Sequence, residues 1–161
     1  MIRLKDLLKE IGEGTSKPYK WEQLSSDEWE TRVSFTTDIG TDYQVNLEYF
    51  ESSFQFAKGL HGIALEFLAK PEDEYEFSNT IVTNKGELYR VMATISNILQ
   101  HYLKDNKIIT YSPEKKPGEN FGKQRDALYK AFIAKKFPNA EFKQIGEMII
   151  TILPSNKSAS V

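Results

Sequence analysis

Two stretches of alternating polar and apolar residues open the regular part of the chain. In TRVSFTT, Val33 and Phe35 take every second position, and in DYQVNLEYF, Tyr43, Val45 and Leu47 do the same. In a strand, every second side chain lies on the same face, so this pattern predicts two strands with one buried face. The turn-forming stretch DIGTD separates them, and we therefore expect a β-hairpin.

Further strands are predicted on both sides of a helical region. GIALEFLAK, which ends at Pro71, is the third strand candidate, and FSNTIVT is the fourth. After the helical region, KIITYS predicts one more strand and EFKQIGEMIITILP predicts a last one. Both are rich in β-branched residues, which favour strands.

The period changes between Lys85 and Lys104. Apolar residues recur there at steps of three and four: Leu88, Val91, Met92, Ile95, Ile98, Leu99 and Tyr102. This spacing predicts a helix that lies on a sheet. Asn84 is a suitable N-cap, and Glu87 completes a capping-box pair.

A second helix is predicted from Lys123 to Lys136. Leu128, Ala131 and Phe132 share its apolar side. The helix should end before Pro138, because proline cannot continue the helical hydrogen bonding.

The element order predicts an α+β fold of the α/β sandwich type. A strand–helix–strand unit forms a parallel pair, so the sheet should be mixed, mainly antiparallel, with helices on its faces. We divide the chain into an amphipathic leader helix (1–13), a loop (14–29), a single domain (30–153) and a disordered tail (154–161).

Composition narrows the possible classes of protein. The 161 residues are 40% hydrophobic and 27% charged, typical of one globular domain, and no apolar run could span a bilayer. The absence of cysteine excludes disulfides and thiolate nucleophiles. Basic residues dominate between 101 and 140, but no nucleic-acid motif accompanies them, so a nucleic-acid partner is not expected. The chain lacks a secretory signal, which predicts synthesis in the cytoplasm.

Candidate catalytic and metal-ligating residues are few. His61 and His101 are the only histidines, and neither stands at a metal-ligand spacing, so no metal site is expected. Ser112 has no elbow glycines around it, which argues against a hydrolase. The acidic turn PEDEYE lacks the alternating ligand pattern of a calcium loop.

The stretches TIVTNKGELYRVMATISNIL, KIITYS and RDALYKAFIAKKF together resemble the core of the GNAT acetyltransferase superfamily. The resemblance covers about Thr31 to Leu153 and implies a strand-helix-strand-helix-strand core. In that family a strand–helix loop holds the coenzyme A pyrophosphate on backbone N–H groups. The matching positions here are Thr83, Asn84, Lys85 and Gly86. The resemblance also implies that Tyr129, in the second helix, would be the general acid toward the departing thiolate.

Several positions depart from the GNAT pattern. The loop has one glycine, Gly86, and Glu87 places a carboxylate where the pyrophosphate should lie. Gly122, Ile133 and Ala134 break the family's second-helix run. We therefore expect no cofactor and a GNAT-like scaffold without an intact acetyl-CoA site. An acetyl-CoA-dependent N-acetyltransferase with an unusual pyrophosphate loop stays open as the alternative.

A second resemblance is based on the leader MIRLKDLLKEIGEG. With the KPY-W loop and the R-x-x-LY of the second helix, it resembles uncharacterised small proteins of tailed bacteriophages, and the leader resembles the capsid-targeting sequences of internal head proteins. Such leaders are cut by a prohead protease after (L/I)-x-E, which Ile11, Glu13 and Gly14 match. The resemblance implies a phage head scaffold or a host protein as partner, and a place in the host cytoplasm or the virion. Alternatively, the leader is a helix that packs on its own domain.

Overall fold

The computed structural model describes residues 17–70, 72, 75, 85–112 and 121–154, with helical side chains from residues 87 and 126 onward. Its elements are β1 (Trp21–Ser26), β2 (Glu30–Thr36), β3 (Asp42–Glu51), the 3₁₀ helix η1 (Gln55–Ala57), β4 (His61–Lys70), α2 (Lys85–Tyr102), β5 (Ile108–Tyr111), α3 (Phe121–Lys136), β6 (Glu141–Ile145) and β7 (Met148–Ile152). The predicted leader (1–13), the FSNTIVT strand (77–83) and nearly all of the predicted tail lie outside the described residues.

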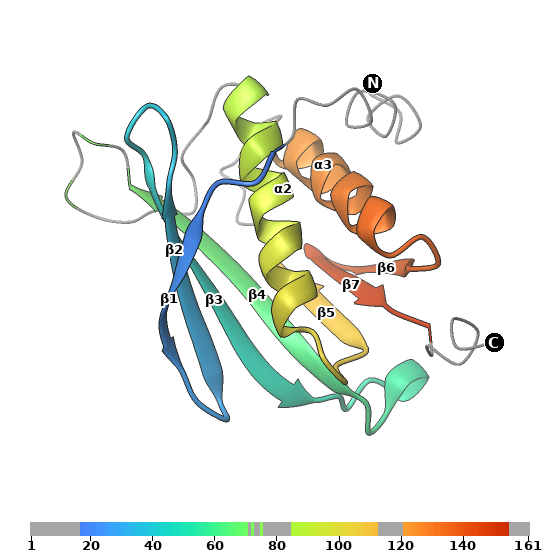
Figure 1. Cartoon of the computed structure of the whole chain (residues 1–161). Coiled ribbons are helices and arrows are strands. Elements are labelled where there is room, and N and C mark those ends of the chain that lie inside the picture. Colours follow the sequence, from blue (N-terminus) through green and yellow to red (C-terminus); the bar gives the residue numbers. More distant parts are fainter. Residues whose placement is uncertain (1–16, 71, 73–74, 76–84, 113–120, 155–161) are drawn as a thin grey trace.

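The strands form one seven-stranded mixed sheet in the order β1-β2-β3-β4-β5-β7-β6 (Figure 1). The first four strands are antiparallel neighbours, as are β5, β7 and β6. Among the described strands only β4 and β5 are parallel neighbours, and the connection between them includes α2. The predicted mixed, mainly antiparallel sheet with two main helices is confirmed.

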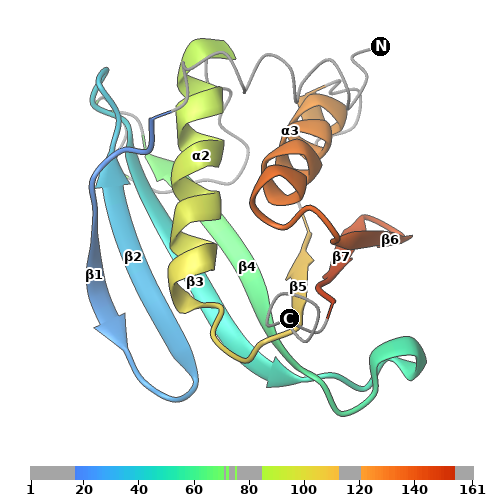
Figure 2. The same cartoon turned by 45° about the vertical axis from the view of Figure 1, so that its right-hand side comes forward.

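Both helices cover the same face of the sheet (Figures 1 and 2). Val91, Ile95 and Leu99 of α2 and Phe132 of α3 are buried in one cluster with inward-facing strand residues such as Val45. The apolar stripe predicted for the first helix is this buried surface. The prediction of helices on more than one face of the sheet is wrong for the described helices, because α2 and α3 share a single core.

The predicted hairpin forms as expected. Thr36 pairs with Asp42 at its closed end, and Val33 lies opposite Val45 on the buried face. The GIALEFLAK and KIITYS strands are present as β4 and β5. The helix predicted from Lys85 to Lys104 ends two residues earlier, and α3 begins two residues before the predicted Lys123.

The loop predicted from 14 to 29 is wrong at its centre, where Trp21–Ser26 forms β1. β1 pairs with β2, and its ladder is interrupted by a bulge between Gln23 and Ser25. The packed domain begins before the predicted Glu30, because Tyr19 is buried in the main core. An edge strand with mostly exposed side chains does not need the alternating pattern by which strands are recognised.

The single last strand predicted from EFKQIGEMIITILP is two strands. β6 and β7 form an antiparallel hairpin in which Ile145 pairs with Met148. Gly146 has a φ of 59°, which glycine adopts without strain and which suits a tight two-residue turn.

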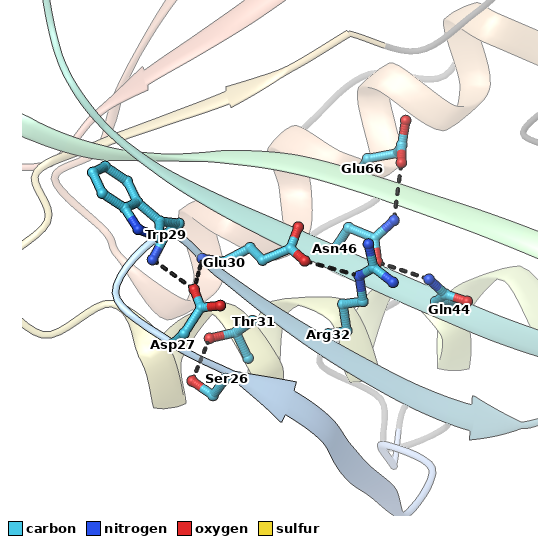
Figure 3. Close-up of polar contacts among 9 residues, drawn as sticks. All are labelled: Ser26, Asp27, Trp29, Glu30, Thr31, Arg32, Gln44, Asn46 and Glu66. Carbon is cyan, nitrogen blue, oxygen red and sulfur yellow. Dashed lines mark hydrogen bonds and ion pairs between the residues drawn. The ribbon is translucent and has the colours of Figure 1, made fainter.

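The face of the sheet away from α2 and α3 is polar over β2, β3 and β4. Asn46 accepts a hydrogen bond from Gln44 and donates one to Glu66, while Arg32 pairs with Glu30 at 3.2 Å (Figure 3). Near β5 and β7 this face is apolar instead. A small cluster there joins Ala57 of η1, Ile108 and Ile150. In the described part of the chain, no helix has the length and apolarity needed to cross a membrane.

Candidate functional site

The first turn of α2 is the position at which the GNAT resemblance puts the pyrophosphate. Lys85 and Gly86 begin the helix, whereas Thr83 and Asn84 lie outside the described residues. Glu87 follows in the first turn and is buried, with 7% of its surface exposed. The N-terminal end of a helix favours negative charge, and here a carboxylate of the chain itself occupies that end.

Tyr129, the acid candidate, lies inside the core. It is fully buried, its ring centroid is 4.7 Å from that of Tyr111, and its hydroxyl is 3.3 Å from the Thr151 hydroxyl of β7. Burial raises the pKa of Tyr129 far above its usual value, which keeps the phenol protonated. A general acid must reach the proton acceptor on its substrate, and among the described residues the Tyr129 hydroxyl lies within hydrogen-bond distance of Thr151 in the core.

Aromatic rings fill the region where the two parallel strands part. β4 pairs with β5 as far as Leu65 and Tyr111, and it then continues for five more residues to Lys70. Phe67, in that extension, stacks on Tyr111 with ring centroids 5.2 Å apart. Phe67, Tyr111 and Tyr129 are all buried, so this part of the structure is packed core.

The two histidines lie on different elements. His61 begins β4 and is exposed. His101, near the end of α2, packs edge-on against Trp21 and Tyr102 with centroids 5.2 and 4.7 Å away. Among the residues that the structure describes, no group of three or more His, Asp or Glu side chains could hold a metal ion.

A polar cavity of about 360 Å³ lies between the β1–β2 turn and the end of α2. Some of its polar groups bond to one another or to the neighbouring Thr31. The Tyr102 hydroxyl donates to Gln23 over 2.6 Å, and the hydroxyls of Ser26, Thr31 and Tyr49 form a chain with distances of 2.8 and 2.7 Å. This satisfied network holds β1 against the rest of the fold.

The turn beside this cavity is built on Asp27. The backbone N–H groups of Glu30 and Trp29 donate to its carboxylate, and these bonds lower the pKa of Asp27 (Figure 3). The turn leaves Trp29 70% exposed. Asp27 therefore has a structural role in the turn between β1 and β2.

Arg90 is the interacting residue that sequence reasoning missed. Its guanidinium lies over the Tyr19 ring, 3.8 Å from the centroid, donates to the Lys17 carbonyl over 2.9 Å and pairs with Asp38 at 2.8 Å. The Tyr19 N–H donates to Thr94 over 2.8 Å. Burial raises the pKa of Tyr19, although the neighbouring guanidinium opposes the shift. The only sequence signal was an arginine on the polar side of a predicted helix.

Comparisons with known proteins add no assignment. No protein-family model matches the chain, and a search of curated proteins returns no match. The processing residues Ile11, Glu13 and Gly14 lie outside the described residues, so the leader assignment stays a prediction from the sequence.

Proposed function

We propose that the chain is a phage-encoded accessory or virion-internal protein with a GNAT-like scaffold and no intact acetyl-CoA site. The position of Glu87 is the observation that supports the lack of an intact acetyl-CoA site. A coenzyme pyrophosphate needs free backbone N–H groups and a positive potential at the helix start. The buried Glu87 carboxylate in the first turn of α2 opposes the second requirement.

The strand arrangement supports the scaffold. A parallel β4–β5 pair connected through α2, with antiparallel strands on either side, agrees with the strand-helix-strand-helix-strand core that the resemblance implies. The extension of β4 beyond its last partner on β5 supports it further. In an enzyme of this class, the space beside that extension would have to admit the acetyl donor. Here Phe67 and Tyr111 pack in it.

The geometry of Tyr129 favours a non-catalytic role. Its phenol is fully buried and within 3.3 Å of Thr151, so it has no route to a departing thiolate without a rearrangement of the core. The residue fits a packing position on α3. This supports a binding or structural protein over an acetyltransferase.

The start of the packed domain supports a leader that can be removed. Arg90 and Thr94 hold the backbone at Lys17 and Tyr19. A cut between Glu13 and Gly14 would leave both of these contacts in place, so the domain should keep its stability after processing. This part of the proposal rests on the (L/I)-x-E match of the leader.

Isothermal titration of the full chain with acetyl-CoA tests the proposal that the acetyl-CoA site is not intact. We expect no binding tighter than about 1 mM, a free energy of only about −4 kcal/mol. A micromolar dissociation constant would overturn the proposal and favour the N-acetyltransferase. In that case Tyr129→Phe should lower turnover while leaving the folded state intact.

Deletion of residues 1–13 tests the proposal that these residues form a removable leader. The melting temperature of the shortened chain should stay nearly unchanged, because the anchor at Lys17 and Tyr19 remains. Mass spectrometry of purified virions should find a mature N-terminus at Gly14. A fall of several degrees would favour a leader that packs on its own domain, and uncut chain in mature particles would rule out processing.

A further inference from the structure

A second cavity, of about 220 Å³, lies between the C-terminal ends of α2 and α3. Lys104, Lys107 and Lys136 contribute the charged part of its wall. The apolar part comes mainly from Leu103, Phe137 and Leu153. An apolar wall with a few charged groups is typical of small-molecule sites.

The charge of this cavity is positive. No acidic side chain occurs among the described residues that line it, and no ion pair between described residues involves Lys104, Lys107 or Lys136. Each helix C-terminus carries about half a negative charge. Two such ends offset roughly one of the three lysines, so a net positive charge is left for a ligand.

Lys104 has an unusual backbone conformation. With a φ of 45°, it is the non-glycine residue of the described chain that lies in the left-handed region. It is the second residue after the end of α2, a position where glycine is common because a side chain strains this conformation. Lys104 lines both this cavity and the polar cavity beside β1, so this strained position lies at a ligand-sized space.

Lys107 is held firmly at the cavity. Its N–H donates to the His61 carbonyl over 2.8 Å, and its own carbonyl accepts from the Leu153 N–H over 2.8 Å. Asn106 closes the preceding turn, since its backbone N–H and its side-chain amide both donate to Leu103, each over 2.8 Å. The backbone that carries Lys107 is therefore fixed before any ligand arrives, which lowers the entropic cost of binding.

We propose that this cavity binds a small organic phosphate with a flat apolar body, the chemistry of a nucleoside monophosphate. The lysines would take the phosphate in charge-assisted hydrogen bonds. The ring would contact Phe137 and Leu153. At about 220 Å³ the space is smaller than most drug-sized sites, which suits one phosphate and one ring system. The inference is independent of the function proposed above, because this site lies at the opposite end of α2 from Glu87.

The test is a titration of the isotope-labelled full chain with AMP, followed by NMR. Amide shifts should move at 103–107 and 136–139, and the affinity should fall as salt is raised. The double variant Lys107→Gln/Lys136→Gln should bind AMP about ten-fold or more weakly. The control is Lys20→Gln, which removes one lysine charge just before β1, at the other edge of the sheet from α3, and should leave the affinity unchanged.

Titrations with adenosine and with inorganic phosphate test separately how much the ring and the phosphate of AMP contribute to binding. Both should bind more weakly than AMP. Adenosine that binds as tightly as AMP would overturn the role of the lysines, and inorganic phosphate that binds as tightly would overturn the ring contact. Equal AMP affinity in the double variant and in Lys20→Gln, with equal melting temperatures, would overturn the site. An oligonucleotide that binds through the same residues much more tightly than AMP would overturn the small-molecule assignment.

Discussion

Arg90→Ala should lower the stability of the whole domain, because Arg90 joins the N-terminal segment to α2. Three contacts would be lost together. These are the stacking of the guanidinium on Tyr19, the hydrogen bond to the Lys17 carbonyl and the ion pair with Asp38. They bring residues more than 50 positions apart in the sequence into one cluster.

The size of the effect follows from the exposure of each contact. Tyr19 is 6% exposed, so its cation–π contact is partly desolvated and should contribute about 1 kcal/mol, with 2 as an upper value. The hydrogen bond to Lys17 adds about 0.5–1.5 kcal/mol. The Asp38 side chain is 77% exposed, so solvent screens the ion pair, which adds little. We expect a loss of about 1.5–3 kcal/mol in the free energy of unfolding.

Urea unfolding followed by circular dichroism measures this loss, and Arg32→Ala is the matched control. Arg32 is also an arginine in an ion pair, with Glu30, but its side chain is 50% exposed on the outer face of the sheet. Its removal should change stability by less than about 0.5 kcal/mol. A cycle that combines Arg90→Ala with Tyr19→Leu should show a coupling of about 0.5–2 kcal/mol. Equal effects of Arg90→Ala and Arg32→Ala would refute the reasoning.

Three further changes test the core. Ile95→Ala, at a fully buried position on α2, should cost about 2–5 kcal/mol in urea unfolding, and a near-neutral result would contradict the packing of α2 on the sheet. Gly62→Ala would bring a methyl group to 2.6 Å from Phe50 and 3.0 Å from the Ile108 carbonyl, so thermal melts should show a loss of about 1–3 kcal/mol. The raised pKa of Tyr129 means that the unfolded chain loses this proton first as pH rises through about 10, so stability should fall above that pH. In Tyr129→Phe, the stability of the fold should therefore fall less between pH 8 and pH 10.5, as measured by unfolding curves at these two pH values. An unchanged pH dependence would contradict the predicted effect of Tyr129.

The elements with strong periodicity could be predicted from the sequence. α2 shows a complete stripe because every turn of that helix contacts the core, and β2 and β3 alternate because one face of each is buried. β1 gave no such signal, since five of its six residues are exposed and Tyr19, which packs, lies outside the strand. The β6–β7 hairpin was hidden because only its second strand is apolar, while β6 is polar and mostly exposed. Gly146 was the only sequence signal for the turn between these two strands.

The candidate site was predicted less well than the fold. Glu87 and Tyr129 are at the elements expected for them, yet burial, which decides what each can do, is a property of the folded chain. Arg90 contacts Lys17 and Asp38 across long sequence separations, and no local spacing indicates such contacts. The three lysines of the proposed phosphate site come from two segments far apart in the sequence, the α2–β5 connection and the end of α3, and no local spacing joins them.

The two outermost strands limit how wide this sheet can become. A free strand edge offers unpaired N–H and C=O groups to any extended chain nearby. On one side, the bulge between Gln23 and Ser25 breaks the regular spacing of those groups along β1. On the other side, β6 carries the exposed charges of Glu141 and Lys143 along its short length. Over the residues that the structure describes, the sheet therefore ends at β1 and β6, because neither border is a regular template for another strand.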